Sequence, residues 1–302
     1  MRAPSSLADN TRSAVYMTAS MAFLNANDAL LKTLAGEVPL FQAVFVRGLV
    51  VTLLVGTLAW HQGAFRSIVG RHDRRMLTLR TLAEIGGTIC FLTALFNMPI
   101  ANATAIIQSV PLAVTLGAAL VFGESVGWRR YLAIAAGFAG VLIIVRPGAE
   151  GFNAWSLWAM ASIVFIVVRD LGTRGVSRQT PAALVVFITG VAMTVVAGGI
   201  AAFGDWVPLD AGQLVRLGLS AFFLVGGYLF GVMTMRTGDI GFVAPFRYTL
   251  LIWAIFFGIV VFDEWPDIWM LAGSSIIVAA GLYTFHRERL LARRRVSGIG
   301  SR

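Results

Sequence analysis

Charged side chains are scarce in this chain of 302 residues: Asp, Glu, Lys and Arg together make up 13% of it. A typical soluble domain carries about 25% charged residues. Hydrophobic residues make up 58% of the chain, and its mean hydropathy is +0.80. So little charge over so long a chain argues against a water-soluble globular protein and indicates one that is embedded in a lipid bilayer.

Cysteine and histidine are scarcer still. Cys90 is the one cysteine and lies inside an apolar run, which excludes a disulfide framework and a thiolate metal site. The three histidines, His61, His72 and His286, are predicted to lie in loops or at helix ends, far from one another in the sequence. We therefore expect neither a metal site nor a bound cofactor.

The chain has 15 acidic residues against 24 Lys and Arg, which gives a net charge of +9. A basic protein can bind nucleic acid, but these basic residues gather in particular loops, as the topology signals of membrane proteins do, so nucleic acid is not an expected partner. The acids of the loops are scattered and the histidines are isolated. The sequence therefore offers no catalytic cluster, and we do not expect an enzyme.

The chain is rich in long apolar runs. A helix needs about 20 mainly apolar residues to cross a bilayer. The connections between the runs are short, so none is expected to fold as a separate soluble domain. The pattern predicts an all-α integral membrane protein with ten transmembrane helices, at about residues 14–35, 39–60, 77–97, 101–123, 128–146, 153–171, 181–203, 214–235, 240–262 and 266–285.

The basic residues predict the orientation of these helices. With the N-terminus on the inner side, all but five of the 24 Lys and Arg fall on that side, and the outer loops receive acids instead. Under the positive-inside rule both termini are then cytoplasmic, together with a basic tail over residues 286–302 that is expected to be disordered. The five exceptions are Lys32, Arg47, Arg146, Arg216 and Arg247, and the outer acids are Glu37, Glu150, Asp205, Asp210, Asp263, Glu264 and Asp267.

The two halves of the chain resemble each other at a nearly constant offset. Asn27-Asp28 corresponds to Arg169-Asp170 at an offset of 142 residues, and Phe122-Gly123-Glu124 corresponds to Phe262-Asp263-Glu264 at 140. We assign the first repeat to residues 14–148 and the second to 153–285. Because each repeat crosses the membrane five times, the second must be inverted relative to the first. Inverted repeats place a substrate at the midplane between the halves and allow one half to rock against the other.

The residues that carry this repeat also carry a family resemblance. The stretch from Ala103 to Gly148, with Pro111 and Arg146-Pro147, and its echo in Ala244-Pro245-Phe246-Arg247-Tyr248 resemble the EamA branch of the drug/metabolite transporter superfamily over residues 14–285. Within that branch, Asn27-Asp28 with Lys32, followed by Phe45-Val46-Arg47-Gly48, is similar to bacterial carriers for riboflavin and for S-adenosylmethionine. The resemblance implies a multi-pass transporter of the bacterial inner membrane, working as a monomer or homodimer.

Two opposite charges are expected at similar depth in the first two helices. Asp28 lies about two turns from the outer end of the first predicted helix, and Arg47 about two turns from the outer end of the second. A charge near the bilayer centre costs at least roughly 2.5–3.5 kcal/mol on insertion scales. Paired across adjacent helices, the two could form a substrate or gating site, or an ion pair that only locks the helices. Asp28 could equally bridge to Lys32, one turn away.

Further candidates lie in the third, fourth and ninth predicted helices. Glu84 could pair with Arg80, four residues earlier, which would be a purely structural role. The counter-charge of Arg247 is expected to be either Glu84 or an anionic ligand. Gln108 and Tyr248 occupy equivalent positions of the two repeats, close to prolines that free backbone carbonyls to line a cavity or that merely kink the helix. The candidates for substrate binding or gating are therefore Asp28, Arg47, Glu84, Gln108, Arg247 and Tyr248.

Together these features predict a secondary transporter that moves a small polar or planar metabolite by alternating access. Riboflavin is the first expected solute and S-adenosylmethionine the second, and Tyr228 and Trp253 would offer stacking faces for a planar ring. The expected partners are the solute and the lipid bilayer, with protons coupled through Asp28 or Glu84 as one driving force. The alternatives are an exporter of amino acids or nucleoside-like metabolites and, more remotely, a membrane enzyme or a channel.

Overall fold

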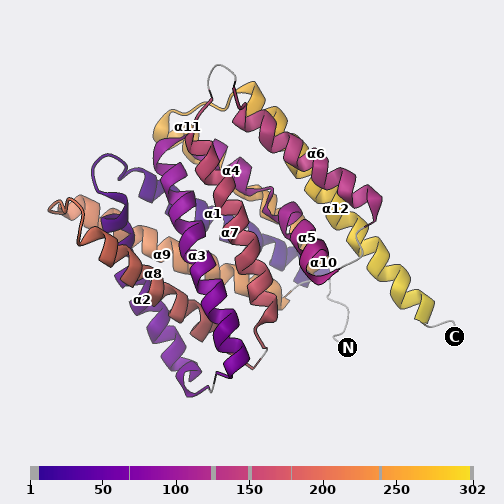
Figure 1. The fold of residues 1–302 in the computed structure, drawn as a ribbon, viewed down its shortest axis with the longest axis horizontal. Coiled ribbons are helices and arrows are strands. Elements are labelled where there is room, and N and C mark those ends of the chain that lie inside the picture. The colour runs from indigo at the N-terminus through magenta and orange to yellow at the C-terminus, as the bar shows by residue number, and fades with distance from the viewer. Residues whose placement is uncertain are drawn as a thin grey trace.

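The computed structural model describes residues 7–67, 69–123, 127–148, 152–177, 179–237 and 240–299, and in these ranges it contains helices and no strand (Figure 1). The helices are α1 (Leu7–Lys32), α2 (Leu40–His61), η1 (Ala64–Arg66), α3 (Arg71–Asn97), α4 (Ile100–Ile107), α5 (Val110–Phe122), α6 (Trp128–Val145), α7 (Trp155–Gly175), α8 (Ala182–Ala201), α9 (Ala211–Thr237), α10 (Ile240–Val243), η2 (Ala244–Tyr248), α11 (Thr249–Phe262) and α12 (Ile268–Ile299).

Within those ranges nine helical spans are long and apolar enough to cross a membrane, with α4 and α5 forming one of them and η2 and α11 another. The predicted first span, α1, has 26 residues but is less hydrophobic overall. The reason is that α1 carries polar residues on a face that is buried in the bundle, among them Ser13, Ser20, Asn25 and Asn27. With α1 added, the ten-helix prediction is confirmed.

Prolines and left-handed residues set several helix ends. α2 begins after Pro39 and α8 after Pro181, because proline lacks the N–H that the first turn of a helix leaves unused. α5 ends at Gly123 and α11 at Asp263, both with a left-handed backbone, φ 64° and 53°. Each pair occupies corresponding positions of the two repeats, so the repeats share their helix boundaries as well as their order.

The fourth and ninth spans are interrupted near their middle. α4 ends at Ile107, and α5 begins after two intervening residues, with Pro111 in its first turn. In the second half, the short helix α10 passes through the 3-10 helix η2, which contains Pro245, before α11 begins. Interrupted helices leave backbone groups that can line a cavity, which is typical of transporter binding sites.

The main helix–helix contacts pair a helix of the first half with a helix of the second half. α1 lies along α9 and α3 lies along α7, while α2 pairs with α8 and α6 pairs with α12. Figure 1 shows the α6–α12 pair at one edge of the bundle and the α2–α8 pair at the other. In the repeat, α1 corresponds to α7 and α3 corresponds to α9. The α1–α9 contact and the α3–α7 contact are therefore equivalent under the pseudo-symmetry of the two halves. On the pseudo-symmetry axis, the hydroxyl of Thr52 meets that of its counterpart Thr194, 3.2 Å away.

Glycine–phenylalanine contacts repeat this reciprocity. A Cβ on Gly86 of α3 would lie 2.6 Å from the ring of Phe165 of α7, and a Cβ on Gly226 of α9 would lie 2.7 Å from the ring of Phe23 of α1. The two glycines are 140 residues apart and the two phenylalanines 142, the offsets predicted from the sequence. Each glycine therefore makes room for a ring of the other half, as small residues do at membrane helix contacts.

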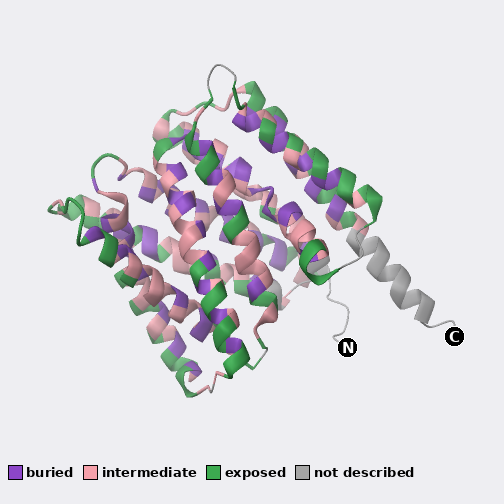
Figure 2. Cartoon of the chain, in the orientation of Figure 1, coloured by how far each residue is buried: buried purple, intermediate pink, exposed green. Residues whose placement is uncertain are grey.

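Burial separates the interior of the bundle from its outer surface. Buried side chains gather between the helices, and exposed ones mark the outward faces, as Figure 2 shows along α6 and α12. Many of the exposed side chains are large and hydrophobic, including Leu53, Leu120 and Val164. In a protein that spans a bilayer these faces contact lipid. The repeat boundaries at residues 148 and 153 stay predictions.

The expected disorder of the basic tail is wrong for most of its length, since α12 continues as a helix to Ile299. Arg, Leu and Ala favour helix, so the tail can extend α12 beyond the apolar span. Glu124 and Glu150, which entered the repeat and the charge pattern, lie outside the described residues.

Candidate functional site

The two halves enclose a cavity of about 350 Å³ in the interior of the bundle. Five of the six predicted site residues line it, and Tyr248 does not. Its ionisable lining consists of four arginines, two carboxylates and one phenol. They are Arg47, Arg80, Arg169 and Arg247, Asp28 and Glu84, and Tyr228. Charges from α1, α2, α3, α7 and η2 thus face one space.

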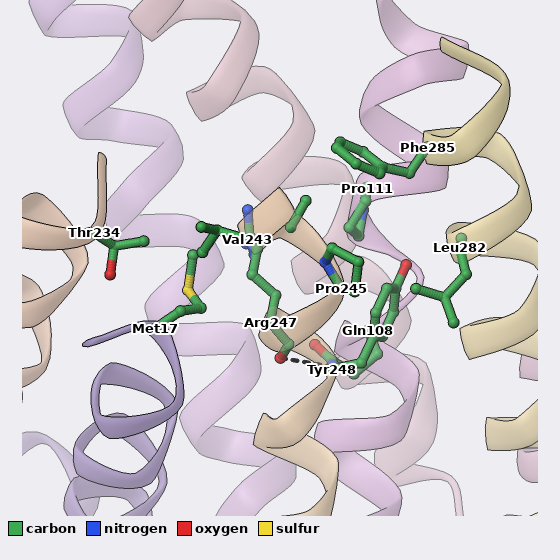
Figure 3. A pocket seen from close by; sticks show the side chains of 12 residues that line it. Met17, Gln108, Pro111, Thr234, Val243, Pro245, Arg247, Tyr248, Leu282 and Phe285 are labelled. Carbon is green, nitrogen blue, oxygen red and sulfur yellow. Dashed lines mark hydrogen bonds between the residues drawn. The ribbon is translucent and has the colours of Figure 1, made fainter. Parts of the chain in front are cut away.

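A second cavity of about 230 Å³ adjoins the first (Figure 3). Its wall is mainly apolar and includes Met17 of α1 and Phe285 of α12, and the two cavities share Gln108, Pro111 and Arg247. The Gln108 side-chain amide donates a hydrogen bond to the backbone carbonyl of Arg247 at 3.3 Å. This bond ties the interruption of the fourth span to that of the ninth, between the two cavities.

Tyr248 lines only the second cavity, where its hydroxyl lies against α12. A Cβ on Gly281 would overlap the Tyr248 hydroxyl, so the absence of a side chain at Gly281 leaves room for the phenol. Trp253, expected to offer a stacking face, packs instead against a small buried cluster that includes Met17 and Val243. Tyr228 is the aromatic residue of the two that faces the larger cavity.

The Asp28 cluster occupies one end of the larger cavity, near the last turn of α1. Asn27 donates from Nδ2 to Asp28 Oδ1 at 2.8 Å. Asn27 Oδ1 accepts from Arg47 Nη1 at 3.0 Å and from Ser220 Oγ at 2.7 Å. The predicted direct pairing of Asp28 with Arg47 is therefore absent, because the side chain of Asn27 stands between them. Lys32 does not bridge to Asp28 either and has other partners.

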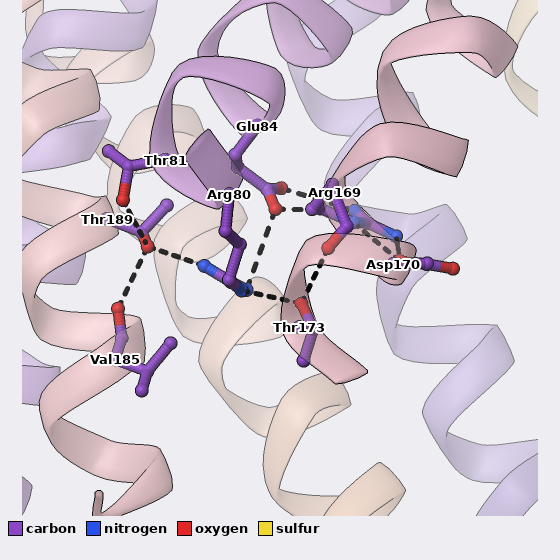
Figure 4. Close-up of polar contacts among 8 residues, drawn as sticks. All are labelled: Arg80, Thr81, Glu84, Arg169, Asp170, Thr173, Val185 and Thr189. Carbon is purple, nitrogen blue, oxygen red and sulfur yellow. Dashed lines mark hydrogen bonds and ion pairs between the residues drawn. The ribbon is translucent and has the colours of Figure 1, made fainter. Parts of the chain in front are cut away.

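The Glu84 cluster occupies the other end, near the last turns of α7 (Figure 4). Arg169 Nη1 lies 3.4 Å from a Glu84 oxygen, and Arg80 Nη2 lies 3.7 Å from the other. Arg169 also contacts Asp170 directly at 2.8 Å, and Arg80 donates to the hydroxyl of Thr189 at 2.6 Å. Glu84 thus pairs with Arg80, as the sequence predicted for a structural role of Glu84, and also with Arg169.

Polar contacts close the bundle at the end where α1 stops. Lys32 Nζ contacts Glu264 Oε1 at 2.5 Å and the carbonyl oxygen of Met98 at 2.7 Å. Glu264 Oε2 accepts from the backbone N–H of Ile100 at 2.9 Å. One ion pair therefore joins α1, the start of α4 and the segment before α12. We call it the Lys32–Glu264 latch.

An exposed ion pair lies beside the latch, between Glu37 and Arg216 at 2.5 Å. Hydrogen bonds from Arg216 hold the pKa of the Glu37 carboxyl below its usual range. Sequence reasoning did not find the partners of either pair. Lys32 was considered only as a partner of Asp28, and Glu37 and Arg216 were assigned only by the side of the membrane on which they fall.

Arg80 and Arg169 are cavity residues that sequence reasoning missed. Both were counted among the inner-side basic residues, because the apolar runs predict their helices to begin at residue 77 and end at 171. α3 begins at Arg71 and α7 ends at Gly175, which places both arginines well inside helices. The repeat offset contained a usable signal, since it aligns Arg169-Asp170 with Asn27-Asp28. Among the described residues no group of three or more His, Cys, Asp or Glu could hold a metal ion.

Comparison with known proteins places this geometry among carriers. Residues 11–146 match the model of the EamA-like transporter family. A riboflavin transporter of Rhizobium johnstonii is 30% identical over 222 residues, which cover 71% of this chain and 70% of that protein. An S-adenosylmethionine uptake transporter of Rickettsia bellii is 25% identical over 89% of this chain and 92% of its own length.

Two further comparisons widen the picture. A pseudopaline exporter of Pseudomonas aeruginosa is 25% identical over 84% of this chain and 88% of that protein. A solved crystal structure superposes with a TM-score of 0.62 at 20% identity, covering 93% of this chain and 98% of the other. At that identity the superposition speaks for the fold alone. The named relatives include proteins of uptake and of export.

Proposed function

Because the chain belongs to the EamA-like transporter family, we propose that it is a secondary carrier whose solute binds in the 350 Å³ cavity between the two repeats. One observation carries the proposal: both halves contribute charged side chains to this cavity, Asp28 and Arg47 from the first and Arg169 and Arg247 from the second. Buried charges at membrane depth mark substrate and ion pathways. In inverted repeats such a site lies where the halves move relative to each other.

The transport step that we propose is a rocking of one half against the other. The Lys32–Glu264 latch closes the end where α1 stops, and it must open for solute to pass there. The Glu84 cluster joins α3 to α7 at the opposite end of the cavity and would separate in the alternate state. Two closures of this kind, one on each side of the solute, are what alternating access requires.

The orientation and the location belong to the same proposal. Both termini are cytoplasmic, as the distribution of Lys and Arg favours. The membrane is the inner membrane of a bacterium, in keeping with the bacterial origin of the named relatives. The latch then closes the outer side. A solute gradient or coupled protons drives transport, and Asp28 and Glu84 are the two carboxylates of the cavity that could carry a proton.

The solute that we propose is a polar metabolite with a planar ring. Riboflavin and S-adenosylmethionine are the two candidates, since relatives of this chain are named for each. Tyr228 offers the cavity an aromatic face, and the arginines offer donors to ring edges. The sequence favours riboflavin, whereas the four arginines and two carboxylates that line the cavity favour S-adenosylmethionine, which carries a carboxylate and cationic groups.

Growth rescue tests the proposed function in cells. A riboflavin-auxotrophic bacterium that lacks its own uptake system, expressing this chain, should grow at low external riboflavin if that is the solute. An S-adenosylmethionine-requiring strain should grow on external S-adenosylmethionine if the second candidate is correct. Failure of both, with the protein confirmed in the membrane, would contradict uptake of either solute and favour export, as in the pseudopaline exporter.

A further inference from the structure

We infer that Arg47 and Asp28 bind opposite charges of the solute, Arg47 a carboxylate and Asp28 an ammonium or another cationic group. This inference rests on the proposed function and names the chemical class of its solute: a zwitterion of the amino-acid type. Three observations support it: Asn27 lies between the two charges, each charge has few hydrogen-bond partners, and the second repeat has a direct ion pair where the first has none.

Arg47 is a buried arginine with unused donors. Its side chain lines the cavity, yet the residue is only 7% exposed. Among the described residues its guanidinium makes one hydrogen bond, to Asn27 Oδ1, and its Nε is buried without a partner. A guanidinium has five N–H donors in a planar fork that fits a carboxylate. A buried charge left in this state is costly unless a ligand completes its bonding.

Asp28 is held by an amide and makes no direct ion pair among the described residues, so that Arg47 is a nearby charge but not a contact. Its carboxylate accepts from Asn27 Nδ2 alone among the described residues, although a carboxylate can accept about four hydrogen bonds. Ser220 and Arg47 both donate to Asn27 Oδ1, which turns the Nδ2 of Asn27 toward Asp28. Asn27 therefore acts as a spacer that keeps the two charges from neutralising each other directly.

In the second repeat the counterparts of Asn27 and Asp28 form an ion pair with each other. Arg169 and Asp170 contact each other at 2.8 Å, and Arg169 also reaches Glu84. At the position that corresponds to Arg47 the second repeat has Thr189, whose hydroxyl is already bonded by Arg80. The same backbone framework thus holds a paired network at one end of the cavity and an unpaired cation and anion at the other. At that end Arg47 and Asp28 both remain available to a charged solute.

The two unpaired groups select among solutes by charge. A neutral solute would leave both Arg47 and Asp28 without a charged partner. An anion without a cationic group would leave Asp28 unpaired and face its repulsion, and a simple cation would do the same at Arg47. A zwitterion completes both groups. The lining as a whole, four arginines against two carboxylates, further favours solutes that carry a carboxylate.

A series of related ligands tests this directly on the purified chain. S-adenosylmethionine and S-adenosylhomocysteine carry the amino-carboxylate, whereas methylthioadenosine keeps the adenosine and thioether without it. Because a ligand of the folded state raises the unfolding temperature, we expect the first two ligands and any amino acid that fits to raise it. Methylthioadenosine and riboflavin should not. The panel should include the common amino acids, since the attached group is not fixed by the two charges.

Variants assign the effect to the two side chains. Arg47→Gln and Asp28→Asn should each weaken binding of the zwitterion by about 30-fold or more, the usual penalty for leaving a buried charge unpaired. The control Arg216→Gln, which removes an arginine outside the cavity, should bind as the unchanged protein does. If a cavity variant does not fold, the ligand series on the unchanged protein still decides.

Two failures are distinguishable. Binding of riboflavin or methylthioadenosine as tight as that of the zwitterions would overturn the inference and leave the carrier in place. So would uptake of another solute into proteoliposomes while no zwitterion binds. If no solute of the panel is taken up at all, the proposed function itself is wrong.

Discussion

Two buried asparagines of α1 differ in whether their side-chain amides are hydrogen-bonded. Asn27 uses both ends of its amide, in bonds to Asp28, Arg47 and Ser220. Asn25, two residues earlier, is fully buried, and neither atom of its amide has a partner. A buried amide without partners costs about 1–3 kcal/mol, whereas a bonded one contributes to specificity. The two asparagines should therefore respond in opposite directions to the same substitution.

We predict that Asn25→Leu stabilises the protein by about 1 kcal/mol or more, because leucine of similar size removes an unsatisfied amide. Asn27→Leu should destabilise it, since Arg47 and Asp28 both lose their partner. Thermal unfolding of the purified variants in one detergent measures both. A lower unfolding temperature for Asn25→Leu would contradict this account, because it would mean that the Asn25 amide stabilises the folded protein.

Sequence reasoning selected residues that share one cavity, but it did not predict their contacts, and their role as a substrate site stays a prediction. Asp28, Arg47, Glu84, Gln108 and Arg247 do line one cavity. Their depth follows from their distance along each apolar run, and intramembrane charge is rare enough to be informative. Which groups bond to which depends on rotamers a few ångströms apart, and the sequence does not contain that information. Asn27 could therefore not be predicted as the group between the two charges.

At the scale of elements, the Lys32–Glu264 latch joins three segments through one buried lysine. The Lys32 side chain is 9% exposed and that of Glu264 24%, against 28% and 46% for the neighbouring pair Arg216–Glu37. In a double-mutant cycle with Lys32→Met and Glu264→Gln we expect a coupling energy of about 1–3 kcal/mol. The exposed pair should give about 0–1 kcal/mol. Equal couplings for the two pairs would mean that the latch does not hold the segments together.

The α6–α12 contact depends on two glycines. A Cβ on Gly140 would lie 2.7 Å from the backbone oxygen of Gly273, whereas a Cβ on Gly199 of α8 would meet nothing within 4 Å. Gly140→Ala should thus destabilise the protein by about 1–3 kcal/mol through overpacking. Gly199→Ala should be neutral or stabilising by up to about 1 kcal/mol, because alanine favours helix. Unfolding curves of the two variants measure the difference. Equal stability of Gly140→Ala and Gly199→Ala would contradict the close α6–α12 packing.

At the scale of the whole molecule, the sequence predicted the helices closely. The apolar runs place seven of the ten spans within about four residues of their observed ends, whereas α1 and α3 begin six or seven residues earlier than predicted and α12 ends later. Which helices of the two halves pack together was not predicted. The interruptions at Pro111 and Pro245 were expected. The prediction of a disordered basic tail was wrong, because it considered only the charges of the tail and not its helix-favouring composition, which continues α12. Charge patterns report the side of the membrane and say little about secondary structure.

The predicted orientation can be tested with introduced cysteines. In a background in which the natural Cys90 is replaced by alanine, a cysteine at Asp205 should react with an impermeant thiol reagent in intact cells, and a cysteine at Gln62 should not. Both positions are exposed at opposite ends of the bundle. Permeabilised cells control for reactivity, since both cysteines should then be labelled. The reverse pattern in intact cells would place the termini outside.

The central claim is that this chain is a carrier whose solute binds at Arg47 and Asp28 between two repeats, and counterflow tests it most directly. Proteoliposomes that contain only this protein are loaded with an excess of unlabelled solute and placed in a trace of labelled solute. A carrier exchanges the two and accumulates label transiently above equilibrium, which a channel cannot do. The account predicts this overshoot for a zwitterionic solute, its retention in Arg216→Gln and its loss in Arg47→Gln. Simple equilibration without an overshoot, or an overshoot that persists undiminished in Arg47→Gln, would contradict it.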